Sequence, residues 1–375
     1  MPTSELPQIA LMRPRLPSAE KISTYLRTID ETRQYTNFGP LLRRFELRLA
    51  ETMEVPEDRL VAVSSATSGL MLALSAVRKT KGAFCLMPSW TFAATPSAAA
   101  AAGLTPFFAD VNEHTWALTP ALAEAAMEKV PGTVAAVIPV APFGAPIDAN
   151  EWAEFARRTG VPVVIDAAAG FDSVQHGPVA VVLSLHATKP LGIGEGGLVI
   201  TANGAEAALV RSLSNYGMPA GIAGQPGFNA KLSEYAAAVG LAALDEWPQA
   251  RANFAALTAT YRDFIENIPE MSRSPGFGGG WVSSTCNVRL PCTAAPVAAN
   301  LKSKGVETRR WWGVGCHLHP AFAECPRADL SVTETLAERT LSLPFYRDLG
   351  DDNVGRVMAA LAEALKAQST EGAAS

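Results

Sequence analysis

Cysteine is scarce in this 375-residue chain, and its few cysteines show no paired spacing. There are five of them, an odd number: Cys85, Cys286, Cys292, Cys316 and Cys325. Such a set predicts free thiols in a reducing compartment and not a disulfide framework. No apolar run reaches the ~18–20 residues of a membrane-spanning helix, and the amino terminus, MPTSELPQIA, lacks the charged and apolar regions of a signal peptide. The expectation is a cytoplasmic protein without a membrane partner.

The chain also has fewer basic than acidic residues. The chain has 31 Lys and Arg against 36 Asp and Glu, a formal net charge of -5, and no basic cluster. Because nucleic-acid recognition leaves a basic footprint, no nucleic-acid partner is expected. Hydrophobic residues make up 48% of the chain. Since single cores stop growing near ~250–300 residues, we predict two domains. The first, 1–245, holds an N-terminal arm and a large domain, and the second, 246–375, is smaller.

Apolar, β-branched runs alternate with helical patterns through the first two thirds of the chain. The runs at 104–110, 135–140 and 161–165 are separated by helical patterns at 120–129 and 150–159. This alternation is typical of βαβ units. It predicts an α/β fold whose large domain has a mainly parallel sheet flanked by helices.

The remaining third predicts a smaller α+β domain. One helix is expected to end near Leu244, and a separate long helix after Trp247 should link to the small domain. That domain is expected to contain a strand at 282–290 and a helix at 295–304. The first 16 residues are dotted with prolines and predict an extended arm.

Two charges stand at strand ends in the middle of the chain. Asp166 follows the apolar run 161–165, and Lys189 follows a second run, 179–185. Ligands of open α/β sheets bind at such carboxyl ends. A lone lysine beside glycines is usually a solvated loop residue, but the upstream carboxylate favours a functional role. Pyridoxal phosphate needs both a lysine amine for its aldehyde and a carboxylate for its pyridine nitrogen. Asp166 and Lys189 are therefore the candidate catalytic residues, and pyridoxal phosphate is the predicted cofactor.

The same stretch resembles the DegT/DnrJ/StrS family of pyridoxal-phosphate-dependent sugar-nucleotide aminotransferases. The motifs that carry the resemblance are Asp166-Ala167-Ala168, Ser184-Leu185-His186-Ala187-Thr188-Lys189 and Gly194-Glu195-Gly196-Gly197. The resemblance implies a fold-type I aminotransferase with a seven-stranded sheet in its large domain. It extends over nearly the whole chain, from about Arg13 to Leu365.

Two competing motifs have the wrong context. The run Gly192 to Gly197 satisfies the G-x-G-x-x-G pattern of dinucleotide sites, but it precedes an apolar strand instead of opening a helix. Cys316, His317 and His319 invite a metal interpretation, but three ligands within four residues lack a closing partner at usual zinc spacing. No metal site is predicted.

The resemblance implies roles for further residues around the cofactor. Small residues after the run 61–63 form a phosphate cradle by shape, since free N–H groups at a helix start attract a dianion. An ordinary capped helix would look the same. The family implies that Thr67, Ser68 and Ser184 hold the cofactor phosphate, with Ala66 where a glycine is usual. It also implies that Trp90 stacks on the pyridoxal ring and that Asn229 reaches the partner subunit's cofactor, so a homodimer with shared sites is expected.

Candidate substrate contacts come from the loops and are less sharply defined. Arginines beside tryptophans suit a carboxylate or sugar-nucleotide pocket. The candidates are Phe143, His186, Glu195, Lys231, Arg310, Trp311 and Trp312. Two departures from the family concern the site: Lys231 replaces an arginine and loses its planar fork, and Ala169 stands where a glutamine near the cofactor's phenolic oxygen is usual.

The resemblance implies an aminotransferase that moves an amino group from glutamate to a nucleotide-linked keto sugar. A second hypothesis is another fold-type I pyridoxal phosphate enzyme, acting on a cyclitol ketone or an amino acid. A third is a regulatory relative without turnover, which the presence of both Lys189 and Asp166 disfavours. The sequence does not distinguish the sugar, the aminated carbon or the nucleotide.

Overall fold

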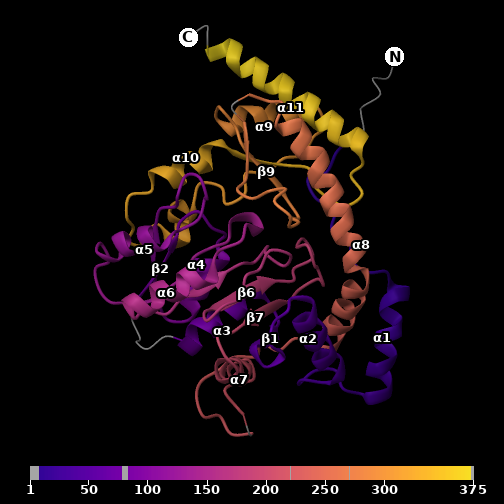
Figure 1. Cartoon of the computed structure of the whole chain (residues 1–375), viewed down its shortest axis with the longest axis vertical. Helices are drawn as coiled ribbons and strands as arrows, with labels where there is room; N and C mark the ends of the chain where they lie inside the picture. The colour runs from indigo at the N-terminus through magenta and orange to yellow at the C-terminus, as the bar shows by residue number, and fades with distance from the viewer. Residues whose placement is uncertain (1–7, 78–82, 220, 270, 373–375) are drawn as a thin grey trace.

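The computed structural model describes residues 8–372 except 78–82, 220 and 270. Figure 1 shows a lower part built on a large sheet and an upper part built on a small one. One long helix, α8 (Glu234–Ile265), runs along both parts. Residues 1–7, which begin the predicted arm, lie outside the described residues. The predicted domain boundary between 245 and 246 falls inside α8 and stays a prediction.

Seven described strands form the large sheet in the order β3-β2-β4-β5-β6-β7-β1. Their bounds are β1 Leu60–Val63, β2 Phe84–Pro88, β3 Thr105–Ala109, β4 Val134–Val137, β5 Val164–Asp166, β6 Ala180–Ser184 and β7 Gly197–Ile200. Parallel bridges from Val137 to Val163 and from Val140 to Asp166 join β4 to β5. Among these strands only β7 is antiparallel to its neighbours. The predicted mainly parallel seven-stranded sheet is confirmed.

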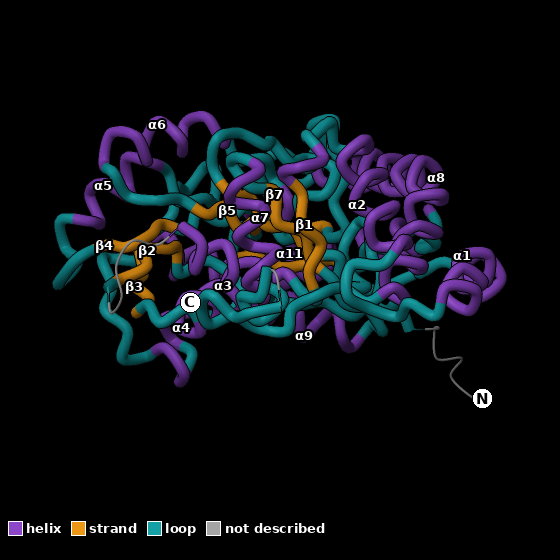
Figure 2. The backbone as a smooth tube through the Cα atoms, turned by 90° about the horizontal axis from the view of Figure 1, so that it is seen from below, coloured by secondary structure: helices purple, strands orange, loops and turns teal. Residues whose placement is uncertain are grey.

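Helices cover both faces of this sheet. Figure 2 shows α3 (Ala66–Val77) and α4 (Ala94–Ala101) on one side, and α5 (Pro120–Met127) and α6 (Ala149–Thr159) on the other. All residues of β1, β6 and β7 are buried, as expected for strands between two helical layers. Gly69 lets α3 approach closely, because a Cβ there would lie 3.0 Å from Val182. Helix α7 (Gly204–Leu213) packs beside α3.

The helix α8 corrects one prediction. Two helices were expected to meet near Trp247, but the structure has a single helix that contains Pro248. Proline removes one backbone hydrogen bond. Buried side chains continue on both sides of it, from Leu244 and Trp247 to Phe254, so packing keeps the helix continuous. Helices α1 (Ala19–Thr32) and α2 (Pro40–Thr52) pack against α8.

The upper part contains a small antiparallel sheet in the order β10-β9-β8. Its elements are β8 Ser272–Arg273, β9 Cys286–Arg289, β10 Thr340–Leu343, α9 Ala294–Ser303, α10 Ser331–Arg339 and α11 Asp351–Gly372. The predicted strand at 282–290 is shorter than expected, while the helix at 295–304 is confirmed within one residue. The N-terminal arm joins this part through a parallel bridge from Ile9 to Val306. None of the helices that the structure describes has the length and hydropathy needed to cross a bilayer.

Candidate active site

The carboxyl ends of β1, β2, β5 and β6 meet at one edge of the large sheet, because these strands run in the same direction. Asp166 is the last residue of β5, and Ser184 is the last residue of β6. Gly197, which begins the antiparallel strand β7, pairs with both Ser184 and Val63. Segments far apart in the sequence are thus brought to one place by the topology of the sheet.

Asp166 is buried, with 4% of its surface exposed. The Thr95 hydroxyl donates to its Oδ2 at 2.7 Å, and the backbone N–H of Ala168 donates to its Oδ1 at 3.1 Å. Burial raises the pKa of Asp166, while the hydrogen bonds from Thr95 and Ala168 and the charge of Lys189 act in the opposite direction. The two donors therefore favour the charged carboxylate in a place where water does not solvate it.

A second hydroxyl lies behind the first. Thr91 Oγ1 and Thr95 Oγ1 are 2.7 Å apart, and both side chains are buried. Because Thr95 gives its proton to Asp166, Thr91 is the donor to Thr95. The Cys316 thiol in turn donates to the Thr91 carbonyl at 3.2 Å. Sequence reasoning missed Thr95, although its place shortly after the predicted Trp90 contact was visible.

Lys189 lies in the tight loop after β6, where its N–H donates to the His186 carbonyl at 2.9 Å. The side chain is half-buried, and within the described residues its amine has no hydrogen-bond partner. Burial lowers the pKa of the Lys189 amine, and the charge of Asp166 opposes that shift. His186 Nδ1 contacts the Thr188 hydroxyl at 2.9 Å, and His186 Nε2 lies 3.8 Å from Glu195. The predicted residues His186, Lys189 and Glu195 are therefore brought together.

The predicted phosphate cradle corresponds to the start of α3. Ser65 Oγ accepts from the Ser68 N–H at 3.1 Å, and the two hydroxyl oxygens are 2.8 Å apart. Thr67 is exposed at this helix start. A Cβ on Gly197 would lie only 2.5 Å from the backbone N of Ala66. Glycine at 197 therefore permits the close approach that puts the helix start beside Ser184.

Trp90 is 1% exposed and belongs to an aromatic cluster. Its ring meets Trp312 edge-on with centroids 5.3 Å apart, and Phe143 with centroids 6.4 Å apart. Phe143 and Trp312 stack on each other at 4.3 Å, and Trp311 packs against the same cluster. Trp90 Nε1 is buried and has no hydrogen-bond partner among the residues that the structure describes. The cluster unites three of the candidate substrate residues with the predicted ring-stacking residue.

Lys231 and Arg310 are engaged in contacts within the chain. Lys231 donates to Asn215 Oδ1 at 2.8 Å, and its amine lies 5.0 Å from the centre of the Tyr216 ring. Arg310 donates to the Ala337 carbonyl at 2.6 Å. Asn229 is exposed, and the segment that carries it lies beside β1 through the bridge from Val63 to Lys231.

Cys316 and His317 have structural partners. His317 is buried, and its Nδ1 lies 2.7 Å from the Ser89 hydroxyl, which also accepts from the His317 backbone N–H. Burial lowers the pKa of the His317 imidazole. In the part of the chain that the structure describes, no group of three or more His, Cys, Asp or Glu side chains could hold a metal ion.

Comparison with known proteins decides the family. Residues 18–362 match the sequence model of the DegT/DnrJ/EryC1/StrS aminotransferase family. The chain belongs to this family. Protein Rv3402c of Mycobacterium tuberculosis is 30% identical over 380 residues, which is 96% of this chain and 91% of that protein.

Two solved structures support the same fold. DesI, solved in the presence of its TDP-sugar product, has a TM-score of 0.87 and 32% identity, and the match covers 99% of this chain and 96% of DesI. A protein from Bacillus cereus ATCC 10987, whose PLP-dependent aminotransferase activity is inferred, has a TM-score of 0.88 and 29% identity, with 95% and 100% coverage. These similarities confirm the predicted fold-type I architecture of this chain.

The residues present in the site fit pyridoxal phosphate. A buried carboxylate, a half-buried amine without a partner among the described residues and a helix start lined by Ser65 and Ser68 suit the cofactor's pyridine nitrogen, aldehyde and phosphate. Ala169 has no side chain that could replace the amide of the usual glutamine. The backbone is close-packed at this position, because a Cβ added at Gly144 would lie only 2.7 Å from the Ala169 carbonyl oxygen.

Proposed function

We propose that this protein transfers an amino group from glutamate to a keto sugar linked to a nucleotide. Its cofactor is pyridoxal phosphate, which when bound supplies an electron sink for bond changes at the amino-bearing carbon. The observation that carries the proposal is the pairing of Asp166 and Lys189 at neighbouring strand ends, both with pKa values shifted by burial. Perturbed pKa values of this kind are typical of catalytic groups.

Each site residue has a proposed task. Lys189 would hold the cofactor's aldehyde, and its lowered pKa makes the neutral, nucleophilic amine more accessible. The same amine would also serve as the base that moves a proton at the substrate's α-carbon. Asp166 keeps the pyridine nitrogen protonated. Thr67, Ser68 and Ser184 bind the phosphate together with the N–H groups that begin α3. Trp90 covers one face of the ring.

The substrate and the assembly are also proposals. DesI was solved with a TDP-sugar product, which supports a nucleotide-linked sugar for this chain as well. Phe143, Trp311 and Trp312 provide flat apolar surface for such a ligand, with His186, Glu195, Lys231 and Arg310 as polar neighbours. Because Asn229 is exposed in the single chain, we propose a homodimer in which Asn229 completes the partner's phosphate site. A cytoplasmic location is proposed from the free cysteines.

The first experiment is the absorption spectrum of the purified protein before and after glutamate is added. Wild type and the surface variant Lys302→Ala should show the band of the lysine-bound cofactor and lose it with glutamate. Lys189→Ala should never show that band. A protein with no chromophore after pyridoxal phosphate is supplied would refute the proposal. A bound cofactor that ignores glutamate would instead support the non-catalytic hypothesis.

The acceptor is tested separately on protein already converted to the amine form. A TDP-linked keto sugar should restore the original band, whereas a cyclitol ketone should not. The opposite result would favour the alternative enzyme of the same fold.

A further inference from the structure

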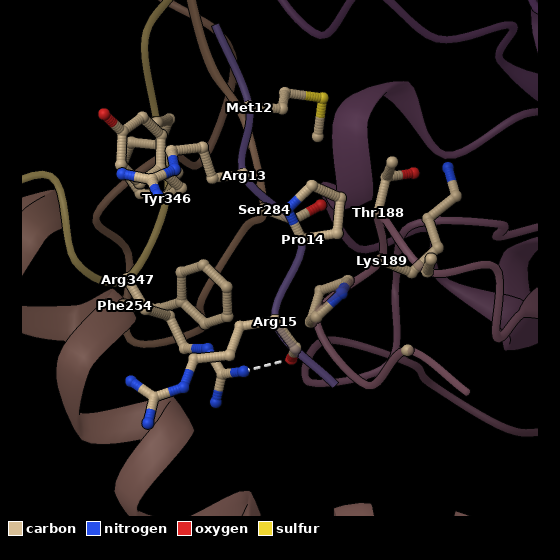
Figure 3. Close-up of a pocket in the computed structure, with 14 residues that line it drawn as sticks. Met12, Arg13, Pro14, Arg15, Thr188, Lys189, Phe254, Ser284, Tyr346 and Arg347 are labelled. Atoms are coloured by element: carbon tan, nitrogen blue, oxygen red, sulfur yellow. Dashed lines mark hydrogen bonds between the residues drawn. The ribbon is translucent and has the colours of Figure 1, made fainter. Parts of the chain in front are cut away.

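The loop after β6 holds Lys189 by its backbone, because the lysine amine has no hydrogen-bond partner among the described residues. Figure 3 shows Thr188 and Lys189 next to each other on this loop, with the lysine side chain directed away from the arginines of the N-terminal arm. A lysine side chain is a charged group on a flexible four-carbon stem. The place where its amine is presented therefore depends on how firmly the loop is held.

A returning segment, residues 192–197, packs against this loop. The Ala187 N–H donates to the Gly194 carbonyl at 2.8 Å. A Cβ at Gly192 would lie only 2.7 Å from the Ala187 carbonyl oxygen, so glycine at this position permits the close approach of the two segments. These contacts anchor the middle of the loop. The two residues that follow Ala187 are held from within the loop, by His186.

His186 contacts both of these residues. Its carbonyl accepts from the Lys189 N–H at 2.9 Å. Its Nδ1 accepts from the Thr188 N–H at 3.3 Å and lies 2.9 Å from the Thr188 hydroxyl. The His186 N–H in turn donates to Ser184 Oγ at 3.2 Å, at the end of β6. One histidine thus connects the strand end to Lys189 and to the residue before it.

The hydrogen bonds also identify which ring nitrogen of His186 carries the proton. A backbone N–H can only donate, so Nδ1 is an acceptor and carries no hydrogen. The Thr188 hydroxyl therefore donates to Nδ1, and the imidazole N–H is at Nε2. Nε2 lies 3.8 Å from Glu195, whose side chain is 73% exposed, so this contact adds little. The His186 side chain holds the loop mainly through Nδ1.

We propose that His186 is a positioning residue for Lys189. Its Nδ1 holds Thr188 and its carbonyl holds Lys189, and together they fix the backbone that presents the lysine amine to the cofactor's aldehyde. Placement of this kind raises the effective concentration of one reacting group at the other. The inference rests on the proposed function, and it gives His186 a task that does not involve the substrate.

The test measures how well Lys189 competes for the aldehyde of the bound cofactor. The loaded protein is titrated with methylamine, which competes with the lysine, and borohydride then makes the remaining bond to Lys189 permanent so that mass spectrometry of the intact protein can count it. His186→Phe removes Nδ1 but keeps a ring, and Thr188→Val removes the hydroxyl. In each variant the methylamine concentration that halves the lysine adduct should fall about threefold to tenfold, as expected for the loss of one or two neutral hydrogen bonds.

Conservative variants separate positioning from a general loss of structure. His186→Asn keeps an acceptor near the place of Nδ1, and Thr188→Ser keeps the hydroxyl, so both should behave nearly like wild type. His114→Phe changes an exposed histidine outside the site and is the matched control. Hydrogen exchange of residues 184–197 in the cofactor-free protein is a second readout, and it should be faster in His186→Phe than in wild type.

The melting temperature shows that each variant is folded. Folded His186→Phe and Thr188→Val proteins that need as much methylamine as wild type would overturn the inference, as would a His186→Asn protein no better than His186→Phe. A role of His186 in substrate contact alone would leave the lysine adduct unchanged and weaken only acceptor binding, which also contradicts the inference. Failure of the proposed function looks different, because wild type itself would then form no lysine adduct.

Discussion

Replacing Thr95 by valine keeps the shape of the side chain but removes the hydroxyl that donates to Asp166. A hydrogen bond to a charged group contributes about 1.5–3 kcal/mol. Its loss should raise the pKa of Asp166 beyond the shift that burial already causes. A carboxyl group that is more readily protonated holds the pyridine nitrogen less well. We therefore expect pyridoxal phosphate to bind about tenfold to hundredfold more weakly.

The assay is a titration of the cofactor-free protein with pyridoxal phosphate, followed by absorbance. Nitrogen NMR of labelled cofactor gives a second readout, because it reports directly on protonation of the ring nitrogen. Thr95→Ser keeps the hydroxyl and should restore both signals. Thr91→Val should have a smaller effect, since Thr95 still donates to Asp166 when its own donor is lost.

Thr95→Val should also change how the stability of the folded protein depends on pH. The folded-state pKa of Asp166 lies above its unfolded value. Its contribution to stability is therefore present at low pH and is lost as pH rises through the folded pKa. Because valine raises that pKa further, the cofactor-free variant should be less stable than wild type, by an amount that grows between acidic and neutral pH. If Thr95→Val binds the cofactor as tightly as wild type, with an unchanged ring-nitrogen signal, the reasoning is wrong.

Three other predictions follow from the structure. Burial lowers the pKa of His317 below its unfolded value, so the stability of the protein should fall as pH drops through about 6.5. His317→Gln should flatten this pH dependence of the melting temperature, whereas the control His114→Gln, at an exposed position, should not. Lys189→Ala and Asn229→Ala subunits, each inactive alone, should regain activity when mixed, because a mixed dimer contains one complete site; a mixture that stays inactive contradicts the shared site. Gly197→Ala should cost about 1–3 kcal/mol in denaturant unfolding, since its Cβ would meet backbone 2.5 Å away, whereas Gly355→Ala has open space and should not destabilise.

The proposed catalytic pair could be identified from the sequence because its signal is local. Asp166 and Lys189 each follow an apolar run, and strand ends in a parallel sheet share an edge. Thr95 could not be found in this way. Its partner is 71 residues away, and only the packing of the start of α4 against the end of β5 shows that the two side chains meet.

Other features depend on tertiary packing in the same sense. A proline at 248 normally ends a helix, and local propensity gives no sign that buried contacts on both sides preserve it. The aromatic cluster joins Trp90 to Trp312 across more than half of the chain. Arg13, Arg15 and Arg347 line one small pocket but come from both ends of the sequence, and no composition or spacing rule unites them.

The distribution of charge affects how the proposed site takes up its ligands. The chain as a whole carries a net charge of -5, so at long range it repels anions. The cofactor's phosphate, glutamate and a sugar nucleotide are all anions. The start of α3 and Lys189 therefore need to reverse the field locally, over distances comparable to the ~8–10 Å screening length of ordinary buffers. Added salt should weaken binding of pyridoxal phosphate to the cofactor-free wild type more than to Lys189→Ala, because the variant has already lost part of the attraction that salt screens.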